Sequence, residues 1–418
     1  MLSCCAIEMK ENFYQWISQV VETLVPLLKF SGNDKVRMAA ISAMPDLLHS
    51  AVLAKDKGPY DGSDSSSIQK FVDDAIPSLV QVLDKEPEQE NSARTISILK
   101  RCIEIPGMHV KSFQVKLIVD EVKKILESIS KRNSEIVNRV KSDDFNIEDD
   151  KFLKRQKEQN VEIVNQIGGC LESLIGKLKI DFLPFFDELL PYMIVMLAND
   201  KPTKEKQTSF HIFNSVMQHC QEVAIKYYNT YLPFLLKACE GENPIVLQEA
   251  ALGIGICAEF GGSDFKPYIG VVLSCLNAML ECPYELGSDG AKAYDKAVSA
   301  LGKICEFHSR SINAEQVLST WLSHLPIRND LIEAKLVHEK LCEMVEKQDT
   351  ELRCPKNLPK VISVFAEVIS QHEKLASEET CEKMMNFLRK IKLDPPSDLE
   401  EVISSLHPQQ QDLLKTIF

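Results

Sequence analysis

Five carboxylates lie close together in the segment KSDDFNIEDD, residues 141–150. Crowded carboxylates can bind a basic protein surface, because each is negatively charged near neutral pH. The next segment, KFLKRQKEQN at residues 151–160, is basic and could pair with them instead. Two interpretations stay open: a contact site for a basic partner, or a solvated loop that joins two long helices. The predicted partner-binding residues are Asp143, Asp144, Glu148, Asp149 and Asp150.

A group of four glycines could bind phosphate, because glycine-rich loops let backbone N–H groups approach a nucleotide. The four are Gly253, Gly255, Gly261 and Gly262. No strand precedes them, however, and the first two fall inside a helical pattern. We interpret these two as helix-packing residues and the second two as a helix C-cap.

Histidine and cysteine are neighbours at two places, where they could act as a nucleophile pair or as metal ligands. His219 precedes Cys220, and His308 lies near Cys305. Both pairs fall at helix ends beside apolar residues, which favours core or surface roles. The sequence also contains no GxGxxG, GxSxG, HExxH or Walker phosphate loop. We therefore predict no catalytic, cofactor-binding or metal site, and we do not expect an enzyme.

The charge balance excludes some classes of partner. The chain has 48 Lys and Arg against 61 Asp and Glu, a formal net charge of −13. Nucleic-acid binding needs a basic surface, so neither DNA nor RNA is expected as a direct partner. The 13 cysteines include no CxxC pair, which favours reduced thiols over disulfides or zinc. The most apolar stretch, residues 189–198, is too short for a bilayer, and no membrane insertion is expected.

Helices must position these residues, because apolar residues recur at three- and four-residue spacing almost throughout. The first such face comprises Trp16, Val20, Val21, Leu24, Leu27 and Leu28. Helices alternate with short turns, so they form pairs. The first helices are predicted near residues 12–30, 68–84, 112–140, 182–198, 224–240, 265–281, 314–324 and 357–370. Their partners are predicted near 34–54, 88–105, 152–178, 203–220, 244–260, 291–308, 330–347 and 377–392, and a short pair, 399–407 and 408–417, follows.

The second helices repeat in sequence. NDKVRMAAISAMP at 33–45 aligns with NPIVLQEAALGIG at 243–255, and Ala297 lies 47 residues after its equivalent, Ala250. That offset is within the range of HEAT repeats. Each pair exposes an apolar flank that the next pair covers. We therefore predict an all-α fold, a HEAT-repeat α-solenoid in which antiparallel helix pairs form a superhelix. Residues 1–418 are expected to form one solenoid of eight to nine pairs, with loop insertions at 55–67 and 141–150.

A few residues are expected to hold the repeats together. Asn33, Asp34 and Asn243 lie where helix N-caps belong, because their side chains can accept hydrogen bonds from the first N–H groups. Trp16 and Trp321 have apolar neighbours at helical spacing, and we predict that both are packing anchors. Small residues in the second helices should allow close approach of the paired backbones.

Several strings along the chain resemble the importin-beta superfamily, in particular its importin-five type (importin subunit beta-3, or karyopherin beta-3) in a plant-like version. They are NDKVRMAAISAMPDLLHSA, DFLPFFDELLPYM, KYYNTYLPFLLKACEGENP, ALGIGICAEFGGSDFKPY, AYDKAVSALGKICEFH, LPIRNDLIEAKLVHEKLCEMVE, LPKVISVFAEVI and HPQQQDLLKTIF. The resemblance implies the C-terminal portion of such a receptor, without the N-terminal arch that mainly contacts Ran-GTP. The chain departs from the family at residues 143–150, which are less acidic, and at Leu247, where the pattern prefers arginine, as at Arg37.

The resemblance implies a nuclear transport receptor. Such receptors import basic cargo proteins that bear nuclear localisation signals, which they bind on an acidic inner surface of second helices. They bind phenylalanine-glycine nucleoporins in apolar grooves between first helices, and they release cargo when the GTP form of Ran binds. The chain is then expected to be a monomer that shuttles between cytoplasm and nucleus through the nuclear pore. The five carboxylates at 143–150 would touch Ran or a basic cargo.

Two other hypotheses stay open. A HEAT-repeat scaffold or adaptor, such as a phosphatase scaffold subunit, would share the repeats but not the quoted strings. A truncated receptor would bind cargo or nucleoporins without Ran-driven release. Nucleoporin binding separates the receptor hypotheses from the scaffold, and Ran-sensitive release separates the complete receptor from the truncated one.

Overall fold

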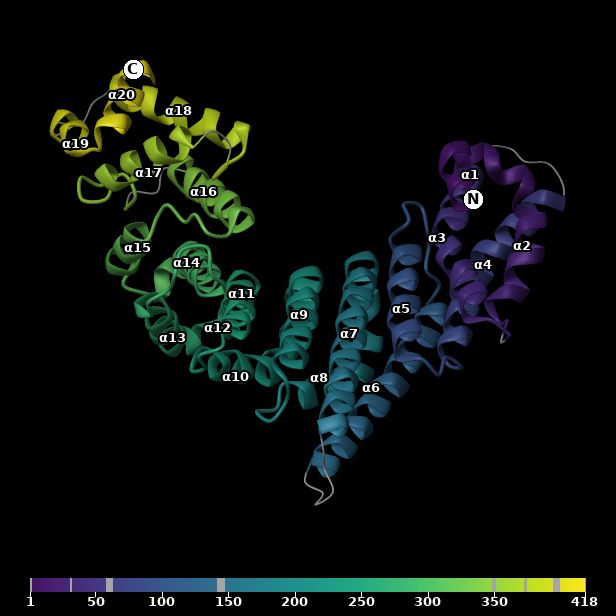
Figure 1. Ribbon diagram of the computed structural model, residues 1–418. Coiled ribbons are helices and arrows are strands. Elements are labelled where there is room, and N and C mark those ends of the chain that lie inside the picture. Colours follow the sequence, from purple (N-terminus) through teal and green to yellow (C-terminus); the bar gives the residue numbers. More distant parts are fainter. Residues whose placement is uncertain are drawn as a thin grey trace. The chain divides into compact units, whose positions relative to one another are not determined.

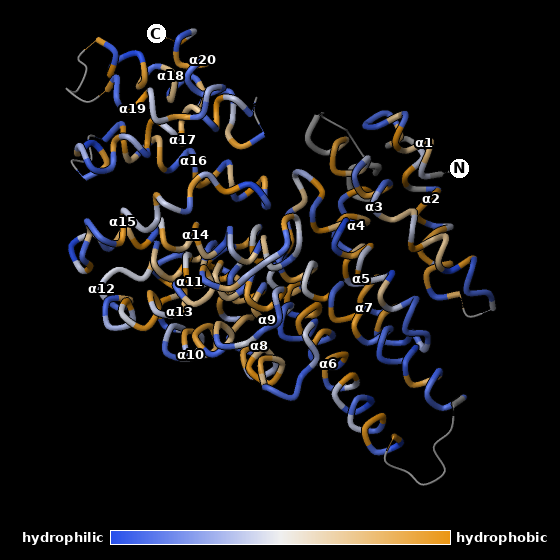
Figure 2. The backbone as a smooth tube through the Cα atoms, turned by 60° about the vertical axis from the view of Figure 1, so that its left-hand side comes forward, coloured by the Kyte–Doolittle hydropathy of each residue, from blue (hydrophilic) through white to orange (hydrophobic). Residues whose placement is uncertain are grey.

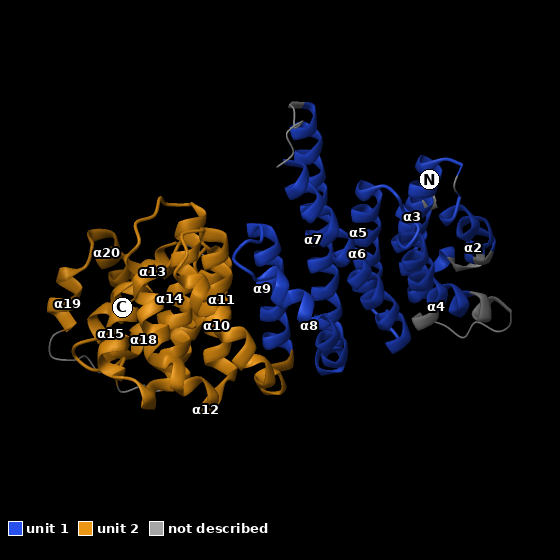
Figure 3. Cartoon of the chain, turned by 90° about the horizontal axis from the view of Figure 1, so that it is seen from below, with its two compact units in different colours: residues 1–219 blue, residues 220–418 orange. Residues whose placement is uncertain are grey.

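The computed structural model describes residues 2–30, 32–57, 63–140, 147–347, 351–371, 374–393 and 399–417. Within these ranges the chain is helical, and it contains no strand. None of the helices described there is long and apolar enough to cross a membrane. The chain divides into two compact units, Met1–His219 and Cys220–Phe418 (Figure 3).

The first unit contains two layers of helices (Figure 1). Its helices are α1 (Leu2–Met9), α2 (Tyr14–Leu28), α3 (Asp34–Lys57), α4 (Ser63–Leu83), α5 (Gln89–Glu104), α6 (Ser112–Val140), α7 (Ile147–Leu178), α8 (Leu183–Met196) and α9 (Thr203–Cys220). The first helices α2, α4, α6 and α8 pack in succession, and so do the second helices α3, α5 and α7. Apolar residues recur among polar ones along the helices (Figure 2). Where they recur every three or four residues, they share one face of the helix, which can be buried.

The second unit continues the same pattern. Its helices are α10 (Tyr228–Cys239), α11 (Pro244–Phe260), α12 (Gly262–Phe265), α13 (Ile269–Glu281), α14 (Asp289–His308), α15 (Ala314–Ser323), α16 (Leu331–Glu346), α17 (Leu358–Ser370), α18 (Glu378–Leu393), α19 (Leu399–Ser405) and α20 (Pro408–Ile417). The second helices α11, α14, α16 and α18 pack in succession, and α20 contacts both α17 and α18. Stacked antiparallel helix pairs confirm the predicted fold class, and the single-solenoid prediction stays a prediction.

Small residues bring neighbouring helices close together, as predicted. A Cβ added to Gly255 on α11 would lie 3.3 Å from the Cα of Ala300 on α14. A Cβ added to Gly302 would lie 2.8 Å from the indole ring of Trp321, which is 1% exposed. Since such distances are at or below van der Waals contact, these two glycines allow close packing. Trp321 is therefore a packing anchor.

The prediction for Trp16 was wrong. Its side chain is 39% exposed and lies beside Phe13, which is buried, with 6.0 Å between the ring centroids. The buried face of α2 instead contains Ile17, Leu24 and Leu28. Spacing alone did not fix which of two adjacent apolar stripes faces the core, because both have helical periodicity.

The two predicted loops are shorter than expected where the structure describes them. Helix α3 continues through Lys57 and α4 begins at Ser63, so most of the loop predicted at 55–67 is helical. Residues 58–62 lie outside the described residues. Likewise α6 reaches Val140 and α7 begins at Ile147, while residues 141–146 lie outside them. Polar composition misled both predictions, because an exposed helix end is as polar as a loop.

Two helices were not predicted, α1 and the single turn α12. Helix α1 packs against α3, and the buried Ser50 hydroxyl donates a hydrogen bond of 3.0 Å to the backbone oxygen of Ala6. Two of the three predicted N-caps are confirmed, because Asn33 Oδ1 accepts from Lys35 N at 2.9 Å and Asn243 caps α11 in the same way. Asp34 is instead the first residue of α3, and its carboxylate pairs with Arg37 one turn later at 2.8 Å.

Candidate functional site

An open groove of about 1220 Å³ lies in the first unit between the first helices α2, α4 and α6. Its lining includes five apolar residues from two of these helices: Val21, Val25, Pro26, Phe71 and Ala75. Phe71 and Ala75 are buried and form the floor, whereas Val21 and Val25 are half-buried. A groove with an apolar floor and an open top can accept an apolar side chain of a partner.

Helix α6 forms one wall of this groove. Leu117 lines it and is 40% exposed, which leaves apolar surface available on a first helix. The neighbouring Ile118 is 1% exposed and faces the core. Successive residues of a helix point in different directions, so α6 can fill the core and line the groove at once.

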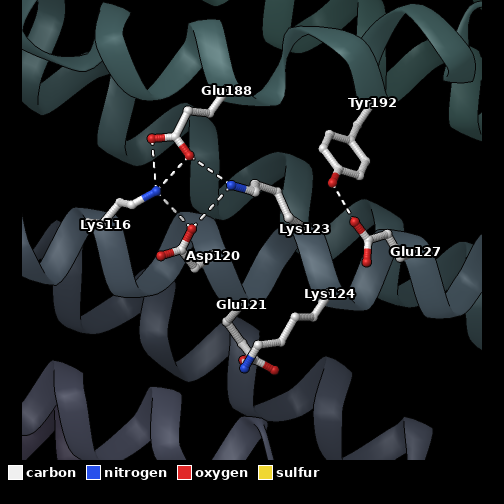
Figure 4. Close-up of polar contacts among 8 residues, drawn as sticks. All are labelled: Lys116, Asp120, Glu121, Lys123, Lys124, Glu127, Glu188 and Tyr192. Atoms are coloured by element: carbon white, nitrogen blue, oxygen red, sulfur yellow. Dashed lines mark hydrogen bonds and ion pairs between the residues drawn. The ribbon is translucent and has the colours of Figure 1, made fainter.

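Charged side chains of α6 connect it to α8 (Figure 4). Lys116 and Lys123 both donate to Glu188, with nitrogen–oxygen distances of 2.6 and 2.7 Å, and both also contact Asp120. Hydrogen bonds from the two lysines lower the pKa of Glu188. These four side chains are a quarter to nearly half exposed, so each ion pair contributes little to the free energy of unfolding. Because the pairs share Asp120 and Glu188, each pair also fixes the orientation of the side chains in the others.

A second charged cluster connects α6 to the end of α4. Lys124 Nζ lies 2.6 Å from Asp84 and 3.1 Å from Glu121, and all three residues line the groove. The hydrogen bond from Lys124 lowers the pKa of Asp84, whereas burial raises that of Glu121. The groove therefore has an apolar floor and a rim of ion-paired residues.

A second, smaller hollow of about 270 Å³ lies between α6 and α8. Leu126, Ile129 and Val195 line it, and Val195 is 52% exposed. The hydroxyl of Tyr192 donates a hydrogen bond of 2.5 Å to Glu127, which lines both hollows (Figure 4). Apolar hollows thus follow one another between first helices of this unit.

The second-helix surface is polar, with charges of both signs. A hollow of about 530 Å³ between α5 and α7 contains Glu90, Glu158 and Glu162 beside Arg94 and Arg155. In the second unit, lysines pair with carboxylates of neighbouring second helices. The pairs are Lys303–Glu259 at 2.8 Å, Lys296–Glu333 at 2.6 Å and Lys340–Glu306 at 3.3 Å. Many of these carboxylates are therefore neutralised within the fold.

The structure describes three of the five predicted partner-binding residues. Glu148, Asp149 and Asp150 lie in the first turn of α7, where negative charge is favourable beside the helix N-terminus. Asp149 pairs with Arg139 of α6 at 2.9 Å. Asp143 and Asp144 lie outside the described residues. Partner binding by these five residues stays a prediction.

His308, Cys220 and Gly261 have structural roles. His308 is buried, and its Nε2 lies 2.8 Å from the backbone oxygen of Ala258. Burial raises the pKa of the Cys220 thiol to about 11, which makes it a poor nucleophile. Gly261 ends α11 and its N–H donates to the Cys257 oxygen at 2.9 Å, which confirms the predicted C-cap. No group of metal-ligating residues occurs within the described ranges.

The sequence analysis did not predict the groove, although the apolar residues of α2 contained a pattern that could have indicated it. Val21 was assigned to the core face of its helix, yet it lines the groove. Two apolar stripes on one helix, at Ile17–Leu24 and at Val21–Val25, could have indicated two contact faces.

Known proteins resemble this chain in sequence and in structure. Residues 92–199, which contain α6 and α8, match the family model "Importin repeat 6". The chain is 21% identical to a probable importin-5 homolog of Dictyostelium discoideum over 91% of its length, and 18% identical to importin subunit beta-3 of Saccharomyces cerevisiae over 93%. It covers 36% and 35% of those relatives, about a third of their length. A crystal structure of Kap121p bound to RanGTP matches all of the chain and 36% of Kap121p, with a TM-score of 0.71 and 15% identity.

Proposed function

Because this chain belongs to the importin-beta superfamily, we propose that it acts in nuclear transport as a receptor of the importin-five type. The observation that carries the proposal is the apolar groove between α2, α4 and α6, whose α6 wall lies within the importin repeat. On this proposal, the groove receives phenylalanine side chains from the phenylalanine-glycine repeats of nucleoporins. The related Kap121p has been crystallised bound to Nup53p, which supports binding to a pore protein.

The groove suits such a ligand because of its size and chemistry. A phenylalanine ring gains most when it leaves water for an apolar pocket, and the glycine beside it lets the peptide backbone approach closely. The smaller hollow between α6 and α8 provides a second place for a ring. Binding at two neighbouring hollows raises the affinity for a repetitive ligand, because the second contact becomes intramolecular.

A glutamate at position 117 tests the groove. Leu117→Glu replaces an apolar side chain of the α6 wall with a charged one, and we expect the Kd for a peptide with several phenylalanine-glycine repeats to rise about tenfold or more. Fluorescence anisotropy of the labelled peptide measures this change. Leu336→Glu is the matched control, because Leu336 is 55% exposed on α16, outside the groove. Equal affinity of both variants and the unchanged chain would refute the groove as the binding site.

Cargo binding and Ran-driven release form the second part of the proposal. Kap121p has been crystallised bound to Pho4p and bound to RanGTP, and we propose that this chain binds a basic cargo with a nuclear localisation signal. A pull-down of such a cargo, with and without GTP-locked Ran, tests this. Release by Ran indicates a complete receptor cycle, whereas retention in both conditions indicates a segment that binds without release. Loss of both cargo and nucleoporin binding would favour a scaffold.

Location in the cell follows from the proposed function. A receptor of this class is expected to shuttle between cytoplasm and nucleus and to concentrate at the nuclear envelope. Imaging of the fluorescently tagged chain checks this, with Leu117→Glu expected to reduce the signal at the envelope. An unchanged rim signal in that variant would separate envelope binding from the groove.

A further inference from the structure

A group of exposed apolar side chains lies in the second unit, where the α13–α14 connection meets the start of α16. We call these five residues the apolar edge patch: Tyr284, Leu286, Leu331, Ile332 and Leu336. Leu286 and Ile332 are 86% and 77% exposed, and the other three are between 37% and 55% exposed. A soluble protein rarely exposes several large apolar side chains together unless they contact a partner.

Hydrogen bonds bring the two parts of the patch together. The backbone N–H of Gly287, next to Leu286, donates to Asn329 Oδ1 at 3.3 Å. Asn329 lies two residues before Leu331, the first residue of α16. The backbone N–H of Asn329 donates in turn to the carboxylate of Asp295 on α14 at 2.6 Å. The connection that contains Leu286 is therefore attached to the start of α16.

Further contacts fix the orientation of both parts. The ring of Tyr284 packs against that of Tyr294, with 4.7 Å between the centroids. A hydrogen bond of 2.6 Å joins the Tyr294 hydroxyl to His324 Nδ1, just after α15. Asp330 Oδ1 accepts from the backbone N–H of Ile332 at 3.1 Å and so caps α16. Because the backbone on both sides is held in place, a partner pays little to order this surface when it binds.

The patch is not a general property of the repeat. The equivalent turn between α10 and α11, residues 240–243, has the sequence Glu-Gly-Glu-Asn and contains no apolar side chain. In the described part of the α17–α18 connection, Leu375 is only 3% exposed. Stacking of the repeats therefore does not require exposed apolar residues at this place.

Charged side chains beside the patch indicate the chemistry of its partner. Glu285 precedes Leu286, and Glu339 lies one turn after Leu336 on α16. Both carboxylates are exposed, and neither forms an ion pair within the described part of the chain. Lys335, also exposed, is a single cation beside them. With a formal net charge of −13 on the whole chain, a basic partner is favoured.

A second copy of this chain fits the patch less well than a basic partner does. Two copies that met at this surface would bring the carboxylates of Glu285 and Glu339 near those of the other copy. Each copy would also bring its own net charge of −13. Like charges placed together at an interface oppose binding.

We propose that the apolar edge patch binds an amphipathic helix of a partner protein, with aliphatic side chains on one face and lysine or arginine beside them. Ile332 and Leu336 are four residues apart on α16, so their exposed side chains form a row. Because this row projects from a helix, the aliphatic face of a second helix covers it more fully than one inserted ring does. The inference goes beyond the proposed function, because such binding requires neither nucleoporin nor Ran.

Two synthetic helical peptides test the proposal on the full chain. Both have leucine at every third or fourth position along one face, and they differ only in the flanking positions, which are lysine in one and glutamate in the other. Fluorescence anisotropy of the labelled peptides gives the Kd of each at physiological salt. We expect the lysine peptide to bind at least about tenfold more tightly than the glutamate peptide.

Variants distinguish binding at the patch from general attraction to an acidic chain. Ile332→Gln removes apolar surface without a change of charge, and the Kd of the lysine peptide should rise about tenfold. Leu393→Gln is the matched control, because Leu393 is 85% exposed at the end of α18, outside the patch, and the Kd should stay within about twofold. Glu285→Gln should raise the Kd more at low salt than at high salt, whereas Glu401→Gln on α19 should not.

Crosslinking locates the bound peptide without any variant. A benzophenone group in the lysine peptide should attach on irradiation to residues 282–288 or 331–336, which mass spectrometry of the digest identifies. Crosslinks only at other residues would overturn the proposal, and so would equal Kd values for the two peptides or for Ile332→Gln and Leu393→Gln. Sedimentation velocity of the chain alone tests the second copy: a dimer that Ile332→Gln dissociates would also overturn the proposal.

Discussion

His338 is fully buried in the second unit, and its Nδ1 lies 2.8 Å from the backbone oxygen of Leu375. Since that oxygen can only accept, Nδ1 carries the proton in the neutral ring. Its Nε2 has no hydrogen-bond partner among the described residues. Burial lowers the pKa of His338 to about 4, so the folded chain holds the neutral form. One residue thereby makes stability depend on pH.

The direction of that dependence follows from proton binding. Below the ordinary histidine pKa of about 6.5, the unfolded chain binds a proton that the folded chain does not take up until about pH 4. The stabilising contribution is therefore complete above pH 6.5 and is lost as the pH falls to 4. We expect the free energy of unfolding of the second unit to decrease by roughly 2–3 kcal/mol over this window.

Urea unfolding at several pH values measures the effect. His338→Gln removes the titrating ring, so the difference in free energy between this variant and the unchanged chain should shrink as the pH falls from 6.5 to 4. A difference that stays constant across the window would show that His338 does not cause the pH dependence.

Side chains of second helices connect each repeat to the next. Arg37 on α3 pairs with Glu86, just before α5, at 2.9 Å. Gln248 on α11 donates to the backbone oxygen of Asp289 at 2.9 Å. Asp295 on α14, fully buried, accepts from the backbone N–H groups of Asn329 and Asp330, before α16. Adjacent positions near the start of the second helix therefore serve the same role with different residue types.

This pattern also explains the departure at Leu247. That position aligns with Arg37, and an arginine was expected there. In this repeat the adjacent Gln248 makes the connection to the next second helix instead. A neutral amide can bond a backbone oxygen without the cost of burying a charge, so the repeat is connected despite the missing arginine.

Removal of the arginine tests this connection. The Arg37 and Glu86 side chains are 10% and 1% exposed, so Arg37→Ala leaves a buried carboxylate without its cation. We expect the free energy of unfolding of the first unit to fall by about 3 kcal/mol. Denaturant titration followed by circular dichroism gives the value.

Arg101→Ala is the matched control. Arg101 pairs with Asp46 at 3.4 Å, but its side chain is 54% exposed, and the loss should be below about 1 kcal/mol. Similar losses in the two variants would mean that burial of the Arg37–Glu86 pair does not set its contribution.

The whole molecule is acidic, with a formal net charge of −13. Many carboxylates of the second helices are paired with lysines, so the remaining negative charge acts mainly at longer range. Such a field attracts a basic partner and accelerates its association more than it strengthens the final complex. Screening by salt weakens the effect, because the Debye length shortens.

The acidic segment at 143–150 provides a test at this scale. Reversal of its five charges, with lysine at Asp143, Asp144, Glu148, Asp149 and Asp150, should lower the association rate of a basic cargo peptide. We expect a decrease of about tenfold at low salt and a smaller one at physiological salt. Stopped-flow fluorescence measures the rates, and an unchanged rate and affinity at low salt would remove this segment from the interaction.

The sequence by itself determined the helical fold. Apolar spacing predicted the helix pairs within a few residues, as at α6 (Ser112–Val140), because helix periodicity is a local property. Small residues at repeat positions predicted the close packing at Gly255, and asparagine predicted the helix caps. The quoted strings also indicated the family.

Only the tertiary structure decided which apolar stripe is buried and which lines a groove. Trp16 and Val21 share helical spacing with the core residues, yet neither is in the core, because neighbouring helices choose the buried face. The contact between Lys124 and Asp84 joins residues 40 positions apart, which no local pattern brings together. The groove likewise exists only where successive repeats meet, because its lining comes from α2, α4 and α6.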